Sequence, residues 1–171
     1  ACEEMSKERI GALIVFARDS MVDEFAKTGT VIDANASEQL IRNIFFPKAA
    51  LHDGAMIVRD GRIYAAGCIL PLTNNTDINS QLGTRHRAAI GMSENSDAIA
   101  VVVSEETGTI SIALGDELKR GYSREELHTE LTALLGNYNT KLVDWEEGSS
   151  LTVSTVRKHK KPEKEKTHGK N

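Results

Sequence analysis

The segment Leu51-His52-Asp53-Gly54-Ala55 places a carboxylate and a glycine directly before an apolar run. A carboxylate such as Asp53 can bind a hard cation through oxygen or accept a proton from a substrate. Gly54 permits a positive φ and lets a ligand approach the backbone closely. Asp-Gly pairs are also common in ordinary turns. Taken alone, this segment is either a turn that leads into a strand or one part of a catalytic site.

Three cationic side chains occur together in Gly83-Thr84-Arg85-His86-Arg87, where the pattern predicts the start of a helix. The positive end of the helix dipole disfavours cations, and a bound anion would remove this conflict. Backbone N–H groups and guanidinium groups both suit phosphate oxygens, and Thr84 can cap the helix or contact such an oxygen. The alternative is a solvated basic patch paired with acidic residues, with His86 as a structural hydrogen-bonding residue.

A third polar segment, Ser104-Glu105-Glu106, follows a predicted strand. Polar residues at the C-terminal end of a strand often face a ligand crevice, although adjacent carboxylates also occur in hairpin loops. Together the three segments offer a carboxylate for a metal, cationic groups for phosphates and a second acidic position. This combination suits phosphoryl or nucleotidyl transfer assisted by a metal ion.

Other classes of active site lack their signatures in this sequence. There is no G-x-x-x-x-G-K-[S/T] loop, no G-x-G-x-x-G, no kinase motif set, and neither C-x-x-C nor H-E-x-x-H. P-loop ATPases, dinucleotide-binding domains and zinc enzymes are therefore disfavoured. The two cysteines, Cys2 and Cys68, exclude a disulfide framework and fit a reducing compartment.

The hydrophobic pattern predicts the elements that must position these segments. Short aliphatic runs predict strands, and apolar residues on one helical stripe predict helices. Asp60-Gly61 predicts a hairpin turn, and Ser123 with Glu126 forms a capping box. The predicted strands are 10–16, 55–58, 63–70, 98–103 and 109–114, and the predicted helices are 37–46, 84–92 and a C-terminal one with Leu127 to Leu135 on one face. A polar loop is predicted at 73–81. We therefore expect a single α/β domain with a central mixed β-sheet flanked by helices.

Composition and charge limit the function further. The 171 residues are 40% hydrophobic, which is enough for one domain with a core. Residues 157–171 carry seven Lys or Arg against two Glu, within a chain of net charge −4. We expect a folded acidic domain at 1–156 and a basic, disordered tail at 157–171. The acidic domain and the 5% aromatic content argue against a nucleic-acid partner.

The two main motifs together resemble those of a known family, the diadenylate cyclases. Asp53-Gly54-Ala55 matches its DGA motif and Arg85-His86-Arg87 its RHR motif, in the same order and separated by a hairpin and a polar loop. Flanking stretches that also match are 10–14, 51–52, 70–72 and 103–108. The similarity extends over residues 8–135. It is greatest to the membrane-anchored members of the family in Gram-positive bacteria.

This resemblance implies the conversion of two ATP into cyclic di-AMP and two pyrophosphates, with Mg²⁺ or Mn²⁺ as cofactor. It implies that Asp53 binds the metal, together with the neighbouring His52, and helps to deprotonate the attacking 3′-hydroxyl. Relatives often carry Tyr where this chain has Ile69, which leaves aromatic stacking on adenine open. The residues implied at the site are Gly54 and Ala55 beside the nucleotide, the Ile69–Leu70 backbone at adenine, Gly83, Thr84, Arg85 and Arg87 at the phosphates, His86 in the same loop, and Ser104 and Glu106 in the same pocket.

The symmetry of the implied product predicts an assembly. Each ATP must act as nucleophile and as electrophile, which two sites facing each other in a homodimer can provide. Family members also associate with a membrane regulator and with phosphoglucosamine mutase.

The resemblance also implies a location. Because no run approaches the ~20 apolar residues of a membrane helix and the first residue is not Met, we expect a soluble fragment of a protein anchored at the cytoplasmic side of the membrane. Two alternatives remain: a nucleotide sensor without turnover, and a binder of anionic polymers through Arg85, Arg87 and the tail.

Overall fold

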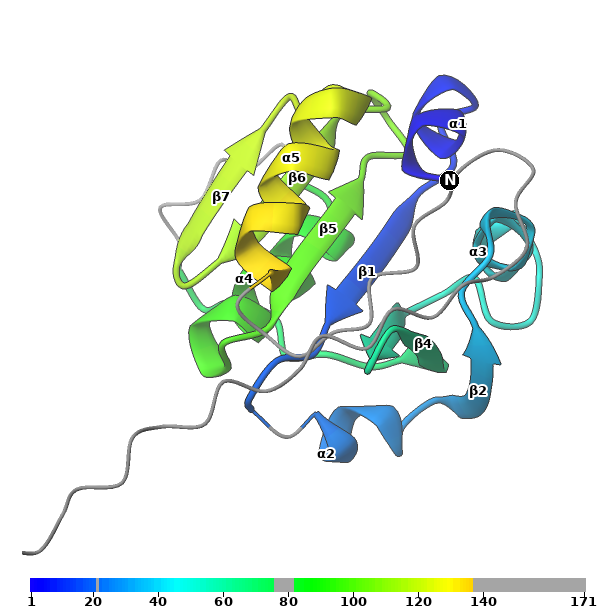
Figure 1. Ribbon diagram of the computed structural model, residues 1–171, viewed down its shortest axis with the longest axis vertical. Coiled ribbons are helices and arrows are strands. Elements are labelled where there is room, and N and C mark those ends of the chain that lie inside the picture. Colours follow the sequence, from blue (N-terminus) through cyan, green and yellow to red (C-terminus); the bar gives the residue numbers. More distant parts are fainter. Residues whose placement is uncertain (21, 76–81, 137–171) are drawn as a thin grey trace, which may run out of the picture.

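The computed structural model describes residues 1–20, 22–75 and 82–136, and these form a seven-stranded mixed sheet covered by helices (Figure 1). The predicted α/β class with a central mixed sheet is confirmed. Along the sheet the strands are ordered β2-β4-β3-β1-β5-β6-β7. The strands are β1 Ala12–Phe16, β2 Thr30–Asn35, β3 Ala55–Arg59, β4 Arg62–Cys68, β5 Ile99–Val103, β6 Ile110–Leu114 and β7 Glu117–Arg120; the helices are α1 Cys2–Lys7, α2 Asp23–Ala26, α3 Glu38–Phe45, α4 Thr84–Asn95 and α5 Arg124–Leu135.

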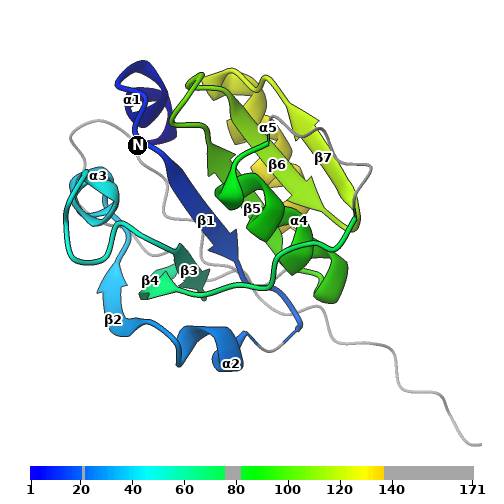
Figure 2. The ribbon, with the colours of Figure 1, turned by 180° about the vertical axis from the view of Figure 1, so that it is seen from behind.

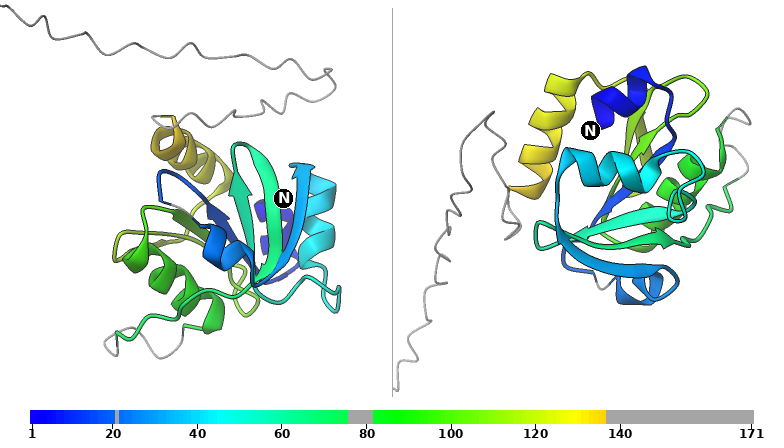
Figure 3. Two further views of the ribbon diagram at one scale, coloured as in Figure 1. Left: turned by 90° about the horizontal axis from the view of Figure 1, so that it is seen from below. Right: turned by 90° about the vertical axis from the view of Figure 1, so that its right-hand side faces the viewer.

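Each face of the sheet has its own core, because successive side chains of a strand point to opposite faces. Leu13 and Val15 of β1 belong to the core beneath α4 and α2. Ile14 of the same strand belongs to the other core, with Met5 of α1 and residues of α3 and α5. Views from behind and from the side show α4 on one face and α1, α3 and α5 on the other (Figures 2 and 3). Central strands buried on both faces explain the continuous apolar runs in the sequence.

Strand pairing determines which loops meet. In the middle of the sheet β1 is parallel to β3, with Ile14 opposite Met56, and antiparallel to β5, with Ala12 opposite Val103. β3 is antiparallel to β4, with Ala55 opposite Cys68. The starts of β1 and β3 and the ends of β4 and β5 therefore lie at one end of the sheet. This pairing brings together the predicted site segments near residues 53, 69 and 104, which follow or precede these strand ends.

The predicted strands and helices are all found, with boundaries shifted by a few residues. Asp60 and Gly61 both have positive φ values of 52° and 73°, as a tight hairpin turn requires. The side chain of Ser37 caps α3, which ends at Phe45 just before Pro47, and the capping box at Ser123 is formed. The predicted tail 157–171 and residues 76–81 of the polar loop lie outside the described residues. No helix in the described part of the chain is long and apolar enough to cross a membrane.

The edge strand β2 is interrupted by a bulge between Val31 and Ala34, where Asp33 has a φ of 46°. Arg62 of the neighbouring β4 fills the bulge, since its Nε donates to Asp33 Oδ1 at 2.7 Å and its Nη1 to Asn35 Oδ1 at 2.7 Å. β2 is mostly exposed and was not predicted from the sequence. Bulges and charged side chains are common features of sheet edges.

Asp97, just before β5, holds the loop that follows β1. Its carboxylate accepts hydrogen bonds from the backbone N–H of Asp19 at 3.0 Å and of Ser20 at 2.9 Å. Burial alone raises the pKa of the Asp97 carboxyl, but the hydrogen bonds from Ser20 and Asp19 outweigh it, so the pKa lies below its usual value. The folded state therefore favours the ionised form.

We call the two hydrogen bonds from Asp19 and Ser20 to the Asp97 carboxylate the clasp. We expect the clasp to contribute fully to the unfolding free energy above the pKa that Asp97 has in the unfolded chain. This contribution is lost as the pH falls through the lower pKa of the folded state. Urea unfolding at pH 7 and pH 3 would measure it. Asp97→Asn should show a smaller loss of unfolding free energy between these pH values than the wild type. Asp19→Asn is the matched control, because the Asp19 side chain is exposed and only its backbone joins the clasp. Equal pH dependence in wild type and Asp97→Asn would contradict the expectation.

Candidate active site

Arg85 links all three polar segments of the sequence. Its Nη1 lies 2.7 Å from Glu105 Oε2 in an ion pair, and its Nη2 donates to the backbone carbonyl of His52 at 3.5 Å. The start of α4 is therefore joined to the loop after β5 and to the residue next to Asp53. Arg85 Nε is buried and has no hydrogen-bond partner within the described residues. The guanidinium thus retains donor capacity that the described residues do not use.

Gly11, the residue before β1, makes room for this contact. A Cβ atom at this position would lie 2.8 Å from both Arg85 Nη1 and Glu105 Oε2. A side chain there would require the flexible ends of Arg85 and Glu105 to shift, so glycine leaves the most room for the guanidinium and the carboxylate to meet beside the start of β1. Gly11 was part of the sequence match but was not predicted as a site residue, and a glycine at the start of a buried strand is the only signal it gives.

The loop before β3 presents Asp53 to solvent. Gly54 has a φ of +99°, and a Cβ there would lie 2.7 Å from the carbonyl oxygen of Cys68. This glycine therefore packs directly on the backbone of β4, and Asp53 is held beside it. Asp53 is exposed, and its carboxylate has no hydrogen bond or ion pair in the portion of the chain that the structure describes. An unpaired carboxylate at this position is available to a cation or a proton.

The ring of His52 is oriented by its own loop. Its Nδ1 lies 2.7 Å from the backbone carbonyl oxygen of Ala49, which can only accept, so Nδ1 carries the proton. In the neutral ring this leaves the lone pair on Nε2. A histidine whose other nitrogen donates to a backbone carbonyl is the usual arrangement for a metal ligand.

The first turn of α4 is electropositive and uncapped. Its N-cap, Gly83, has no side chain to accept a hydrogen bond, and no acidic residue lies in this turn. The side chains of Thr84 and Arg87 are exposed, and the described residues give the Arg87 guanidinium no partner. Residues two apart do not share a helix face, so Arg85 and Arg87 point in different directions from the helix. The helix start nevertheless combines two cations with the N–H groups of Thr84 and Arg85, which have no acceptor among the described residues.

His86 differs from its two neighbours because its ring is buried in the core, with 5% of the residue exposed. Burial, and to a lesser extent the positive charge of Arg120 on β7, lower the pKa of His86. Its Nε2 has no hydrogen-bond partner among the described residues. The predicted part of His86 in the catalytic loop stays a prediction.

The connection after β4 borders the same end of the sheet. The side chain of Ile69 is 70% exposed, its N–H donates to Thr28 Oγ1 at 2.8 Å, and Leu70 is buried in the core. The chain then crosses α4 closely at Gly91, where a Cβ would lie 2.3 Å from the carbonyl oxygen of Pro71. Thr28 and Gly91 were not predicted, although a glycine inside a predicted helix is a signal of close packing.

The loop after β5 holds the other predicted nucleotide-binding residues. Ser104 is 8% exposed, and its Oγ accepts a hydrogen bond from the N–H of Thr107 at 3.2 Å. Glu106 is exposed, and no partner of its carboxylate is found in the described ranges. Of the two glutamates, it is Glu105, not predicted from the sequence, that pairs with Arg85.

The site lies on an open face of this chain. Two hollows, of about 230 Å³ beside Val31 and Tyr64 and about 360 Å³ beside Tyr122 and Glu130, lie elsewhere and contain none of the residues predicted for the site. The side chains of Asp53, Thr84, Arg87 and Glu106, all predicted for the site, are instead exposed at the surface.

Comparisons with known proteins agree with one another. Residues 1–118 match the family model described as the DisA bacterial checkpoint controller nucleotide-binding domain. The chain is 46% identical over 150 residues to a diadenylate cyclase of Listeria monocytogenes, covering 85% of this chain and 55% of that protein. It is 44% identical over 133 residues to the cyclic di-AMP synthase CdaA of Bacillus subtilis, covering 78% of this chain and 49% of CdaA. The chain thus spans about half the length of these curated relatives.

Two solved structures have the same fold. A double cysteine mutant of DacA from Staphylococcus aureus is 45% identical, with a TM-score of 0.76, covering 77% of this chain and 88% of that one. A protein of Bacillus cereus described as a hypothetical membrane spanning protein is also 45% identical, with a TM-score of 0.69, covering 71% of this chain and 60% of that one.

Proposed function

Since this chain belongs to the diadenylate cyclase family, we propose that it condenses two ATP into cyclic di-AMP with release of two pyrophosphates. The observation that carries the proposal is the position of Arg85. It ties the start of α4 to the His52 carbonyl, one residue from Asp53, whose exposed carboxylate has no partner in the described part of the chain. A cationic group for phosphates and a base for a hydroxyl are thereby neighbours.

The reaction consists of two identical displacements. The 3′-oxygen of each ribose attacks the α-phosphorus of the other ATP; a P–O bond forms, the bond to the bridging oxygen of pyrophosphate breaks, and pyrophosphate leaves. The proton of each 3′-hydroxyl passes to the carboxylate of Asp53, which has no competing partner in the described structure. Gly54 and Ala55 let the nucleotide approach the backbone beside this base.

The phosphates bind at the start of α4. The N–H groups of Thr84 and Arg85, which have no acceptor in the described structure, would contact phosphate oxygens together with the Thr84 hydroxyl and the backbone of Gly83. Arg85 and Arg87 would balance the negative charge as pyrophosphate departs. His86 would complete this loop. Because the Arg87 side chain has no protein partner in the described residues, it can turn toward a bound phosphate without breaking an ion pair.

The residues present fit a divalent metal ion, which we propose to be Mg²⁺ or Mn²⁺. No group of three or more His, Cys, Asp or Glu side chains that could hold a metal occurs in the described residues. One or two protein ligands suffice when substrate phosphates and waters supply the rest. Asp53 and the Nε2 of His52 would hold the ion. Such an ion supplies charge stabilisation at the phosphate and lowers the pKa of a bound hydroxyl.

We place adenine at the connection after β4. Ile69 and Leu72 have exposed apolar side chains, 70% and 45% respectively, which can cover the face of a base. The N–H of Ile69 is already used by Thr28, so the neighbouring backbone of Leu70 is left to recognise the base edge. Ser104 and Glu106 would line the other side of the nucleotide.

One assay tests the function. The protein is incubated with ATP and Mg²⁺ or Mn²⁺, and the nucleotides are separated. Cyclic di-AMP together with pyrophosphate in a ratio of one to two supports the proposal. Tight ATP binding without product would instead support a sensor, and salt-sensitive retention of oligonucleotides would support a binder of anionic polymers.

We further propose that the active form is a homodimer with the two sites face to face. The exposure of Asp53 and Arg87 supports this, because a second chain facing them would supply the other ATP. In a mixture of wild type with an excess of Asp53→Asn, most wild-type chains are expected to be in mixed dimers with one active base. They should accumulate the linear dinucleotide with a single phosphodiester bond, detected by mass spectrometry, and form little cyclic product. Wild-type levels of cyclic product per wild-type chain in this mixture would contradict the dimer.

The full-length protein is proposed to be held at the cytoplasmic side of the membrane. The description of the Bacillus cereus relative as a membrane spanning protein supports this location. A membrane regulator and phosphoglucosamine mutase are the proposed protein partners, by resemblance to the family.

A further inference from the structure

Helix α1 is in direct contact with the loop that carries Glu105. The hydroxyl of Ser6 donates to the backbone carbonyl of Gly108 at 2.6 Å, across 102 residues of sequence. Gly108 has a φ of +75°, and a Cβ there would lie 2.5 Å from the carbonyl oxygen of Ser6. The backbones of α1 and of the loop are therefore as close as glycine allows, and the hydrogen bond holds them in this position.

The loop itself, residues 104–109, is closed by its own hydrogen bonds. The N–H of Gly108 donates to the carbonyl of Ser104 at 2.8 Å, and the N–H of Ser104 donates to the carbonyl of Thr109 at 3.0 Å. A shift of Gly108 is thus passed to the start of the loop, where the Glu105 carboxylate lies 2.7 Å from Arg85. The contact at Ser6 and the contact at Arg85 are two ends of one short, closed loop.

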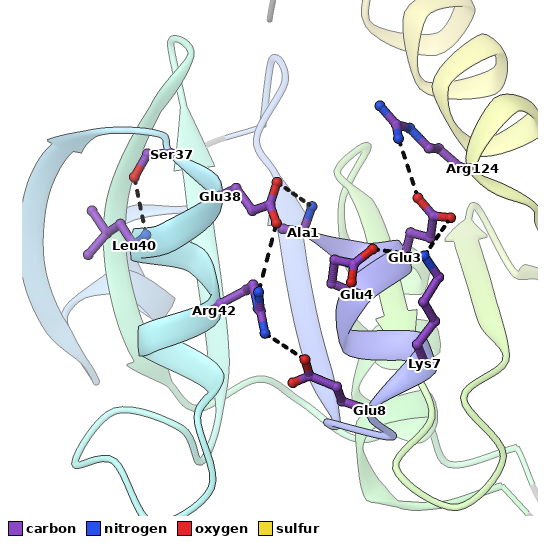
Figure 4. A network of polar contacts seen from close by, with 10 residues as sticks. All are labelled: Ala1, Glu3, Glu4, Lys7, Glu8, Ser37, Glu38, Leu40, Arg42 and Arg124. Carbon is purple, nitrogen blue, oxygen red and sulfur yellow. Dashed lines mark hydrogen bonds and ion pairs between the residues drawn. The ribbon is translucent and has the colours of Figure 1, made fainter. Parts of the chain in front are cut away.

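Helix α1 is itself fixed on its face of the sheet. Met5 is fully buried in the core shared with α3 and α5. Ion pairs join Glu8 to Arg42 of α3 at 2.6 Å and Glu3 to Arg124 of α5 at 3.4 Å (Figure 4). Each exposed pair contributes little to stability, and Met5 supplies the anchoring, so Ser6 has a defined position against the loop.

We propose that Ser6 and Glu105 are positioning residues for Arg85: α1 sets the loop 104–109 through Ser6, and the loop aims the Arg85 guanidinium through Glu105. The inference rests on the proposed function, because Arg85 is assigned there to the phosphates. The inference adds Ser6 and Glu105 to the residues on which nucleotide binding depends, although neither is proposed to contact the substrate. It also joins the segment ahead of β1 to the phosphate site, so that a displacement of α1 changes nucleotide affinity.

The test measures the affinity of the protein for α,β-methylene-ATP by calorimetry. This analogue cannot react, because a methylene group replaces the oxygen between its α- and β-phosphorus atoms. Ser6→Ala removes one hydrogen bond and is expected to weaken binding about threefold to tenfold. Glu105→Gln is expected to weaken it by a similar factor, since it removes the charge opposite Arg85. Ser6→Thr keeps the hydroxyl and should restore most of the affinity. Lys7→Ala is the matched control, because Lys7 lies in α1 and its ion pairs among the described residues are with Glu3 and Glu4 of the same helix.

Arg85→Ala supplies the decisive comparison. In that background Ser6→Ala should change the affinity by less than about 1.5-fold, because the residue that it positions is gone. An equal factor in both backgrounds, or a loss in Lys7→Ala as large as in Ser6→Ala, would overturn the proposal. The function is judged separately: wild type that binds the analogue but forms no cyclic di-AMP from ATP refutes the proposed reaction and leaves this titration valid. Wild type that does not bind the analogue overturns both.

Discussion

Replacing Asp53 with Asn is expected to lower the rate of cyclic di-AMP formation by about 10²- to 10⁴-fold, the range found when a general base is lost. The amide cannot accept the proton of the 3′-hydroxyl, and it is a poorer ligand for a hard cation. The decrease should appear in kcat if the carboxylate has the proposed role as the base for the reacting hydroxyl. The initial rate of pyrophosphate release measures it.

The same substitution should leave the fold intact. Asp53 is exposed, and its carboxylate has no partner in the described structure, so the unfolding free energy should change by less than about 0.5 kcal/mol. Asp116→Asn is the control, because Asp116 is an exposed turn residue between β6 and β7. Asp116→Asn should keep full activity. Wild-type turnover in Asp53→Asn, or equal losses in the two variants, would refute the assignment of Asp53.

Replacing Gly54 with Ala is expected to lose both activity and stability. Alanine at a φ of +99° costs about 1–3 kcal/mol in backbone strain. The Cβ would also lie 2.7 Å from the carbonyl oxygen of Cys68, and relieving such a contact typically costs a further ~1–3 kcal/mol. Because β3 or β4 must move to relieve it, Asp53 moves too. Urea unfolding and the rate of product formation measure the two effects.

Gly121→Ala separates strain from steric contact. Gly121 follows β7 with a φ of +88°, and a Cβ there meets nothing within 4 Å. It should therefore lose only the strain, about 1–3 kcal/mol, and keep its activity. A Gly54→Ala variant no less stable than Gly121→Ala would show that the close approach to β4 is unimportant.

Much of this fold could be predicted because the buried strands and the turns have strong local signals. β1 and β5 are buried on both faces and appear as continuous aliphatic runs, and the Asp60-Gly61 turn requires two positive φ values. By contrast, α1 and α2 are only six and four residues long, too short for a periodic pattern. β2 and β7 are exposed edge strands without strict alternation. Their formation depends on neighbouring strands, which a local pattern does not contain.

The site was predicted less completely than the fold, for a related reason. Residue types and motif spacing indicated Asp53 and Arg85, and the structure brings their segments together. The choice of Glu105 as the partner of Arg85 depends on the register of β5 against β1, which places the loop beside Gly11. Ser6 contacts the backbone of Gly108 and Gly91 contacts the backbone of Pro71. These partners are distant in the sequence and adjacent only in the fold. At Gly91 the only local signal is a glycine inside a predicted helix, and at Ser6 the sequence has no local pattern that indicates the contact.

The two edges of the sheet affect how this protein behaves when concentrated. An unprotected edge strand offers a row of hydrogen-bonding groups to another chain and promotes fibrous aggregates. Here one edge is kinked at Asp33 and filled by Arg62, and the other, β7, carries Glu117, Lys119 and Arg120 as exposed side chains. Neither readily accepts an added strand. Preparations at high concentration should therefore stay free of thioflavin-positive fibres, and any self-association should leave both edges unpaired.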